Sequence, residues 1–164
     1  MEFIPLLLEH YEQVNAIYMD GLATGQASFQ KEGKSWEEWD RGHLQQCRLV
    51  AVSDGIVLGW AALSPVSSRP VYAGVAESSV YIAEAARGKG IGLALMQRLV
   101  EESEAAGIWT LQVSIFPENK SSVGLHQKVG FRIQGYRERI GRMKSGEWRD
   151  TVLMERRSAV VGNF

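Results

Sequence analysis

Arg87-Gly88-Lys89-Gly90-Ile91-Gly92 lies between an alternating strand pattern at 77–83 and an amphipathic helix pattern at 90–106. Its glycines allow backbone conformations and close approaches that a side chain would prevent. The turn also presents backbone N–H groups at the start of a helix. Those donors, the helix dipole and the two basic side chains favour binding of a phosphate or pyrophosphate.

Three nucleotide-binding patterns can be compared with this turn. A dinucleotide-binding turn needs G-x-G-x-x-G and an acidic residue about 20 residues further on, whereas the glycines here are spaced G-x-G-x-G. A nucleoside-triphosphate loop needs G-x-x-x-x-G-K-[ST], which the stretch lacks. The pattern [QR]-x-x-G-x-[GA] is filled by Arg87, Gly90 and Gly92. A turn used for tight packing alone is the remaining alternative.

The flanking patterns predict a mixed α/β fold. We expect strands at 2–5, 49–53, 56–63, 77–83, 109–115, 131–142 and 147–156, and helices at 8–19, 35–46, 90–106 and 119–129. Gly21 and Gly25 are expected to end the first helix. Asp54-Gly55 predicts a two-residue hairpin, and the strand-helix-strand crossing at the glycine-rich turn predicts one parallel pair. The expected fold is a largely antiparallel sheet of about seven strands with helices on both faces, in one domain (1–157) followed by a loose tail (158–164).

Composition limits the possible partners. The 164 residues carry a formal net charge of -1, so charge alone does not draw the whole protein to nucleic acid or an anionic membrane. Cys47 is the single cysteine, which excludes an internal disulfide framework, and a packed role is favoured over a nucleophilic one. With His10 and His43 it forms no metal-ligand spacing, so no metal is expected. The sequence shows neither a signal peptide nor a membrane span, which predicts a cytoplasmic protein.

The motifs together resemble those of the GNAT acetyltransferases. Residues 87–92 resemble the family's acetyl-CoA pyrophosphate loop, and residues 80–84 its pantetheine strand. Asn119, Ser122, His126 and Gly130-Phe131 resemble the pattern N-x-x-[AS]-x-x-x-[YH]-x-x-x-G-F. The resemblance implies a splayed acetyl-CoA cleft. The residues it implies for binding the co-substrate are Ile82, Ala83, Glu84, Arg87, Gly88, Lys89, Gly90, Ile91, Gly92, Leu93, Asn119 and Ser122.

A narrower resemblance points to the acceptor. Residues 27–29, 69–72, 76–81 and 146–150 resemble the phosphinothricin and methionine sulfoximine acetyltransferases. This resemblance implies acetylation of the α-amino group of a small amino-acid-like molecule of the phosphinothricin, methionine sulfoximine or methionine sulfone type. It also implies direct attack in a ternary complex, and a homodimer.

The resemblance implies two catalytic residues. Glu77 corresponds to the proposed general base, and the alternative is a solvated strand carboxylate. His126 stands where many relatives have a tyrosine that is proposed to protonate the CoA thiolate. His126 either does the same or packs against CoA without chemistry. The backbone N–H of Ile82 is expected to hold the acetyl carbonyl.

Five residues are expected to contact the acceptor. Arg69 suits its carboxylate through a two-pronged hydrogen bond, the alternative being an exposed loop charge. Phe29 and Tyr72 are expected beside it, although Phe29 can equally be a packing residue. Ser79 and Tyr81 share the face of Glu77 if no bulge intervenes.

Two other functions fit the same motifs. The acceptor amine can belong to a protein N-terminus, a lysine or a polyamine instead of an amino acid. A protein of a different class, a non-catalytic CoA-binding sensor, is the other alternative, and Glu77 beside a complete CoA turn argues against it.

Overall fold

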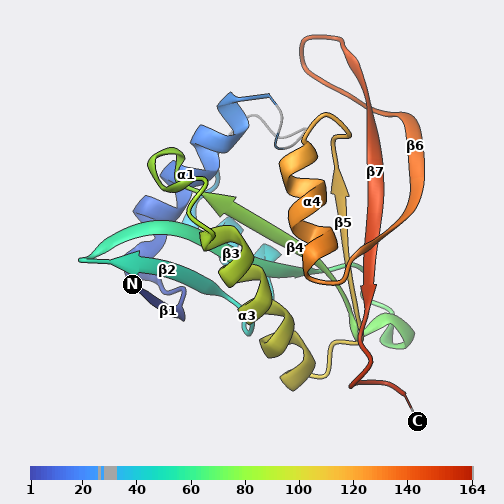
Figure 1. Cartoon of the computed structure of the whole chain (residues 1–164), viewed down its shortest axis with the longest axis horizontal. Helices are drawn as coiled ribbons and strands as arrows, with labels where there is room; N and C mark the ends of the chain where they lie inside the picture. Colours follow the sequence, from blue (N-terminus) through green and yellow to red (C-terminus); the bar gives the residue numbers. More distant parts are fainter. Residues whose placement is uncertain (26, 28–32, 164) are drawn as a thin grey trace.

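A computed structural model describes all residues except 26, 28–32 and 164. Within the described residues, seven strands form one sheet in the order β1-β2-β3-β4-β5-β7-β6 (Figure 1). The strands are β1 (Glu2–Pro5), β2 (Leu49–Ser53), β3 (Ile56–Pro65), β4 (Val75–Ile82), β5 (Thr110–Ile115), β6 (Arg132–Arg142) and β7 (Trp148–Arg157). The helices are α1 (Tyr11–Ala23), α2 (Trp36–Gly42), α3 (Ile91–Ala105) and α4 (Lys120–Lys128), with short 3-10 turns η1 (Leu8–His10), η2 (Pro70–Tyr72) and η3 (Glu84–Ala86).

The strand pairing agrees with the sequence pattern. Asp54 and Gly55 both have positive φ, 49° and 76°, as a two-residue hairpin between β2 and β3 requires. β4 and β5 pair in parallel, and the other pairs among the described strands are antiparallel. The predicted mixed, largely antiparallel sheet is confirmed.

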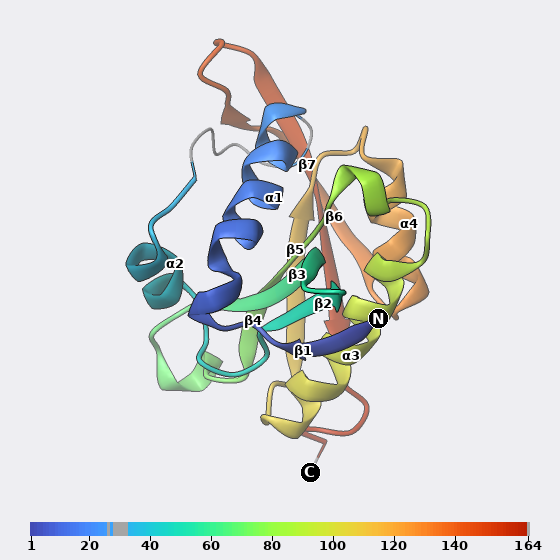
Figure 2. The same ribbon diagram turned by 90° about the vertical axis from the view of Figure 1, so that its left-hand side faces the viewer.

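The sheet is covered by helices on both faces. Figure 2 shows α1 and α2 on one side and α3 and α4 on the other. Trp39 and Trp60 lie in the cluster beneath α1 and α2, whereas Leu95, Met96 and Leu99 pack α3 against the opposite face. No helix in the described part of the chain is both long and apolar enough to cross a membrane.

Helix α1 begins at Tyr11, after the 3-10 turn η1, and not at the predicted residue 8, and the C-terminal ends of α1 and α2 also differ from the prediction. α1 continues through Gly21, because this glycine makes room for a ring: a Cβ there would lie 2.9 Å from Cδ1 of Tyr81. Helix α2 starts after the predicted N-cap Ser35, whose Oγ accepts from the Glu38 N–H. It ends at Gly42, before the predicted residue 46, and the Leu44 N–H then donates to the Leu63 carbonyl at 2.8 Å.

The C-terminal segment is held to the body of the protein. Ser158 is 3% exposed, and its Oγ accepts from the N–H groups of Val160 and Val161, both at 3.0 Å. The Arg157 guanidinium donates to the carbonyls of Ser158, Val161 and Gly162. The expectation of a loose tail is therefore wrong for residues 158–163, because side chains at its base satisfy its backbone.

Candidate active site

The central feature of the site is a gap between β4 and β5. These strands pair from Val75 opposite Thr110 to Glu77 opposite Gln112. Beyond that point β4 stays on β3 and β5 stays on β7, so the two strands diverge, as Figure 1 shows. The expected splayed cleft is present, and Glu77 lies where it opens.

The gap exposes a backbone donor at Ile82. The Ala83 N–H donates to the Leu58 carbonyl in β3 at 2.8 Å. Because N–H groups alternate in direction along a strand, the Ile82 N–H points the other way, into the gap. This amide is placed to hold a carbonyl oxygen, whereas the Ala83 amide is already used.

The glycine-rich turn leads from β4 into α3. Gly88 and Gly90 have φ of 76° and 79°, conformations that favour glycine. Gly90 is the N-cap of α3, has no side chain to cap it, and lies with its neighbours 87–89 on the surface. No side chain in the described part of the chain caps the start of α3, so the first amides of this helix can bind an anion.

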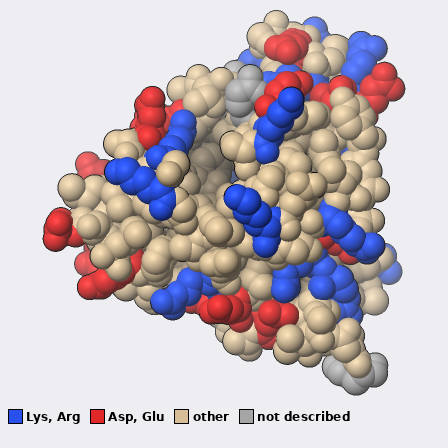
Figure 3. Space-filling model, in the orientation of Figure 1, with Lys and Arg blue, Asp and Glu red and all other residues tan. Residues whose placement is uncertain are grey.

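The surface around this turn is hollowed. Figure 3 shows a hollow between the segment leading into α3 and α4, with Lys and Arg side chains at its rim. Uncapped amides, basic side chains and a gap between strands fit the pyrophosphate and pantetheine parts of CoA. Glu84 is exposed in η3, and Leu93 lies half-buried in the first turn of α3.

Helix α4 borders the cleft and carries the second motif. Asn119 is its N-cap, and its Oδ1 accepts from the Ser122 N–H at 3.3 Å and from the Ser121 hydroxyl at 3.2 Å. Asn119 therefore sets the start of the helix.

His126 is 2% exposed and packs edge-on against Phe131. Its Nδ1 lies 2.7 Å from the Ser122 carbonyl. Since a carbonyl accepts, this bond places the proton of the neutral ring on Nδ1 and leaves Nε2 as an acceptor. Burial also lowers the pKa of His126. Both features favour the packing role over proton donation to a thiolate.

Glu77 combines access with an altered pKa. Its side chain is exposed to solvent, yet partial desolvation raises the pKa of the carboxyl, and the Arg137 guanidinium partly offsets this rise. A carboxylate with a raised pKa is better matched to accepting a proton near neutral pH.

The β3–β4 register is unbroken from Gly59 to Pro65. Ser79 and Tyr81 therefore share the face of Glu77, on the side of α1 and α2. The Tyr81 ring stacks on Trp60 at 5.1 Å and meets Tyr18 edge-on at 5.2 Å. Tyr81 thus belongs to the aromatic core as well as to the wall of the cleft.

The other expected acceptor residues lie elsewhere. Arg69 and Tyr72 are exposed in the β3–β4 connection, where the guanidinium carbon lies 5.6 Å from the centre of the Tyr72 ring. Phe29 falls outside the described residues. The structure therefore pairs Arg69 with Tyr72.

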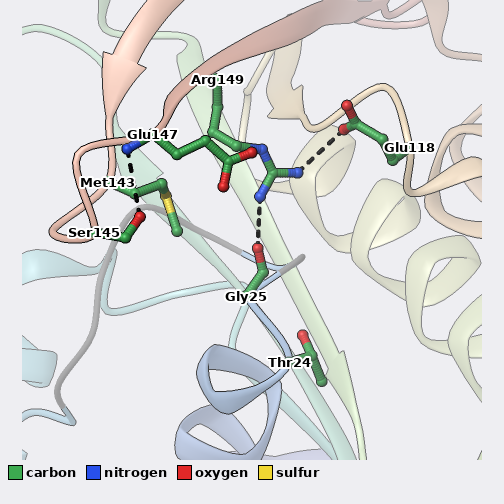
Figure 4. A pocket seen from close by; sticks show the side chains of 7 residues that line it. All are labelled: Thr24, Gly25, Glu118, Met143, Ser145, Glu147 and Arg149. Carbon is green, nitrogen blue, oxygen red and sulfur yellow. Dashed lines mark hydrogen bonds and ion pairs between the residues drawn. The ribbon is translucent and has the colours of Figure 1, made fainter.

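Sequence reasoning missed a pocket of about 330 Å³ beyond the end of α1 (Figure 4). It is lined by Thr24, Gly25, Glu118, Met143, Ser145, Glu147 and Arg149. Arg149 is 7% exposed, donates to the Gly25 carbonyl at 2.7 Å and pairs with Glu118 at 3.1 Å. Its guanidinium lies 3.8 Å from the Phe116 ring centre. The motif at 146–150 includes Arg149 and could have drawn attention to this residue, but a sequence motif does not show that a side chain is buried.

Two other properties bear on ligand binding. The buried hydroxyls of Ser78 and Thr151 have no hydrogen-bond partner among the described residues. Such groups are found where water or a ligand completes the bonding. Within the same residues, no group of His, Cys, Asp and Glu is arranged to hold a metal ion.

The fold and the cleft are those of a CoA-binding acyltransferase, and comparison with known proteins identifies the family. The sequence profile of the Acetyltransferase (GNAT) family matches residues 11–131. The chain therefore belongs to the GNAT acetyltransferase family, which confirms the resemblance seen in the sequence.

Two of the relatives are named for the molecules that they acetylate. The L-methionine sulfoximine/L-methionine sulfone acetyltransferase of Pseudomonas paraeruginosa is 36% identical over 65% of this chain and 63% of its own length, so the match spans less than two thirds of that relative. The phosphinothricin N-acetyltransferase of Alcaligenes faecalis is 34% identical over 87% of this chain and 75% of its own.

A solved structure shares the whole fold. The phosphinothricin acetyltransferase of Sinorhizobium meliloti in complex with AcCoA superimposes with a TM-score of 0.87 at 28% identity, covering 99% of this chain and 91% of that one.

Proposed function

We propose that this protein is an acetyl-CoA-dependent N-acetyltransferase that acetylates the α-amino group of a small amino-acid-like acceptor. The observation that carries the proposal is the position of Glu77, a carboxylate with a raised pKa at the point where β4 and β5 separate. The names of the two relatives support an acceptor of the methionine sulfone or phosphinothricin type.

Different residues have different roles in the proposed acetyl transfer. Acetyl-CoA supplies the thioester. The uncapped amides of α3, with Arg87 and Lys89, bind its pyrophosphate, and the Ile82 N–H polarises the thioester carbonyl. Glu77 takes a proton from the acceptor ammonium, directly or through water. The amine nitrogen then bonds to the acetyl carbon, the carbon–sulfur bond breaks, and the thiolate leaves and takes a proton.

Glu77→Gln tests the proposal. The variant should lose about 10²–10⁴-fold in kcat at neutral pH, with the KM for acetyl-CoA unchanged. The matched control is Glu155→Gln, because Glu155 lies opposite Gln112, which itself lies opposite Glu77. It therefore shares the face of Glu77 without bordering the gap, and its activity should stay close to wild type. Full activity of Glu77→Gln would remove Glu77 as the base.

The acceptor class needs a separate assay. Thiol release from acetyl-CoA is measured with phosphinothricin, L-methionine sulfoximine, L-methionine sulfone, spermidine and an alanine-initiated peptide. We expect turnover with the amino-acid analogues. Turnover with spermidine or the peptide alone would refute the proposed acceptor, and no thiol release with any amine would favour a CoA-binding sensor.

We also propose that the protein works in the cytoplasm as a homodimer. Four large apolar side chains are about half exposed on the last two strands: Ile133, Tyr136, Ile140 and Trp148. Exposed apolar side chains gathered in this way are typical of association surfaces. Light scattering should give twice the chain mass, and Ile140→Asp should lower it. A monomer at all concentrations would contradict the proposal.

A further inference from the structure

The face of the sheet that carries Glu77 is only partly covered by helices. The cluster beneath α1 and α2 draws its strand residues from β1 to β4, and none of its described members belongs to β5, β6 or β7. The same face of those three strands therefore extends beyond the helices, next to the gap where Glu77 lies.

The register places Arg137 on this face. Glu77 lies opposite Gln112, and Gln112 lies opposite Glu155. Arg137 of β6 lies opposite Thr151, four residues before Glu155 on β7. Because side chains alternate along a strand, residues 151 and 155 point the same way. Arg137 and Glu77 therefore project from the same side of the sheet.

The charges on this face leave Glu77 and Arg137 without direct partners. Arg149 is paired with Glu118, and Arg132 lies opposite Glu155. Among the described residues, neither Glu77 nor Arg137 belongs to an ion pair. The positive charge of Arg137 nevertheless acts on Glu77, since it lowers the pKa of that carboxyl against the effect of desolvation.

The space between the two side chains suits a zwitterion. Two strands separate β4 from β6, so at ~4.8 Å per step the axes of β4 and β6 lie roughly 14 Å apart, and the four-residue offset between Thr151 and Glu155 adds roughly 13 Å along the strands. The Cα atoms of Glu77 and Arg137 are then roughly 20 Å apart, and the two long side chains, extended toward each other over the sheet, leave room between their charged ends for a molecule the size of a small amino acid. An α-amino acid offers an ammonium for Glu77 and a carboxylate for Arg137.

We propose that Arg137 binds the α-carboxylate of the acceptor and so orients its amine toward Glu77 and the gap between β4 and β5. This inference rests on the proposed function and names the residue that selects an amino acid over a simple amine. A guanidinium suits the role because it can bind both carboxylate oxygens at once.

A bulge in β6 holds Arg137 in place. The register shifts between Arg137 and Gly141, and Arg139 has a φ of 50°. Asp150 fixes the bulge from β7: its carboxylate accepts from the Arg139 N–H at 2.6 Å and from the Tyr136 hydroxyl at 2.5 Å. These two hydrogen bonds thereby anchor Arg137, which lies two residues before the strained Arg139, at the site.

Arg69, the carboxylate-binding residue expected from the sequence, provides the competing assignment. Its guanidinium lies over the Tyr72 ring in the β3–β4 connection, and the register evidence does not place it on the face of Glu77. The two assignments make different predictions for the variants Arg137→Gln and Arg69→Gln.

The test measures KM for L-methionine sulfone and for its carboxamide, which lacks the carboxylate charge. Because a hydrogen bond to a charged group contributes about 1.5–3 kcal/mol, Arg137→Gln should raise KM for the acid about 10–100-fold. KM for the carboxamide and for acetyl-CoA should stay near wild type. Arg132→Gln is the matched control, an exposed arginine on the same strand and the same face, and it should leave both acceptors unaffected.

Two further measurements separate binding from a structural effect. Arg137→Lys keeps the positive charge but lacks the two-pronged hydrogen bonding of a guanidinium. Relative to Arg137→Gln, it should restore part of the lost affinity. Removing the positive charge should also move the acid limb of kcat/KM to higher pH, because Arg137 lowers the pKa of Glu77.

Equal losses with acid and carboxamide, or a loss selective for the acid in Arg69→Gln instead, would overturn the assignment. Failure of the wild-type protein to acetylate either acceptor would be a failure of the proposed function itself.

Discussion

Replacing Arg149 with methionine should destabilise the protein strongly, because this side chain joins three segments. It extends from β7 to the carbonyl of Gly25 after α1 and to Glu118 after β5. A hydrogen bond from a charged donor contributes about 1.5–3 kcal/mol. The contact with the buried Phe116 ring adds about 1–2 kcal/mol. The pair with Glu118, a residue 62% exposed, adds about 0–1 kcal/mol.

Methionine also removes the cost of burying a guanidinium, which offsets part of the loss. We therefore expect Arg149→Met to lower the free energy of unfolding by about 2–4 kcal/mol. At roughly 2–4 °C per kcal/mol for a chain of this size, the melting temperature should fall by about 10 °C.

Thermal unfolding followed by circular dichroism measures the effect. Glu118→Gln is the control, and it should cost less than about 1 kcal/mol because the Glu118 side chain is mostly solvated. Added salt should leave the difference between wild type and Arg149→Met nearly unchanged, since the main contacts are buried. The reasoning fails if Arg149→Met melts with the wild type, or if Glu118→Gln costs as much.

Four other outcomes follow from single residues. Gly90→Ala should lower the free energy of unfolding by about 1–2 kcal/mol and raise KM for acetyl-CoA, because Gly90 has a positive φ. Gly124→Ala, in the middle of α4 with space around it, should instead stabilise by about 0.5–1 kcal/mol in the same melting assay. The apparent pKa of the acid limb of the kcat/KM profile should lie above about 4.3, the ordinary pKa of a glutamate, because desolvation raises the pKa of Glu77. An apparent pKa at or below that value would contradict this prediction. Burial lowers the pKa of His43 to about 4. Below about pH 6.5 the unfolded state therefore binds a proton before the folded state does, and the free energy of unfolding falls. His43→Asn should lose less stability than the wild type over that pH range, and equal losses would contradict the shift.

Local patterns were sufficient for most of the fold. Asp54-Gly55 fixed the hairpin because both residues adopt the positive φ that the turn needs. The prediction that Gly21 ends the helix was wrong because the reason for a glycine at this position is a tertiary contact. The Tyr81 ring from β4 occupies the space beside it. A sequence does not show which ring will approach a glycine. A glycine that ends a helix and a glycine that allows close packing therefore cannot be distinguished from sequence alone.

The two halves of the site differ in how far sequence reveals them. The expected CoA side depends on neighbours in the chain, such as Gly88, Gly90 and the start of α3, so a local sequence motif is sufficient to propose it. The acceptor side depends on the order of strands. Arg137 and Arg149 come within reach of the site because β7 follows β5 and β6 lies beyond it. An arginine within a strand pattern otherwise indicates a solvent-exposed position.

The same geometry bears on the chemical route. Glu77 faces the side of α1 and α2, whereas the uncapped start of α3 lies on the opposite side of the sheet (Figure 2). In the proposed reaction the acceptor and the thioester would therefore approach from opposite faces and meet in the gap between β4 and β5, where the Ile82 amide points. A relay through Cys47 does not fit this arrangement. Cys47 is buried, lies before β2 and away from the gap, and desolvation raises the pKa of its thiol to about 11. A thiol of that kind supplies almost no thiolate near neutral pH, so direct attack by the amine is the route that the described residues support.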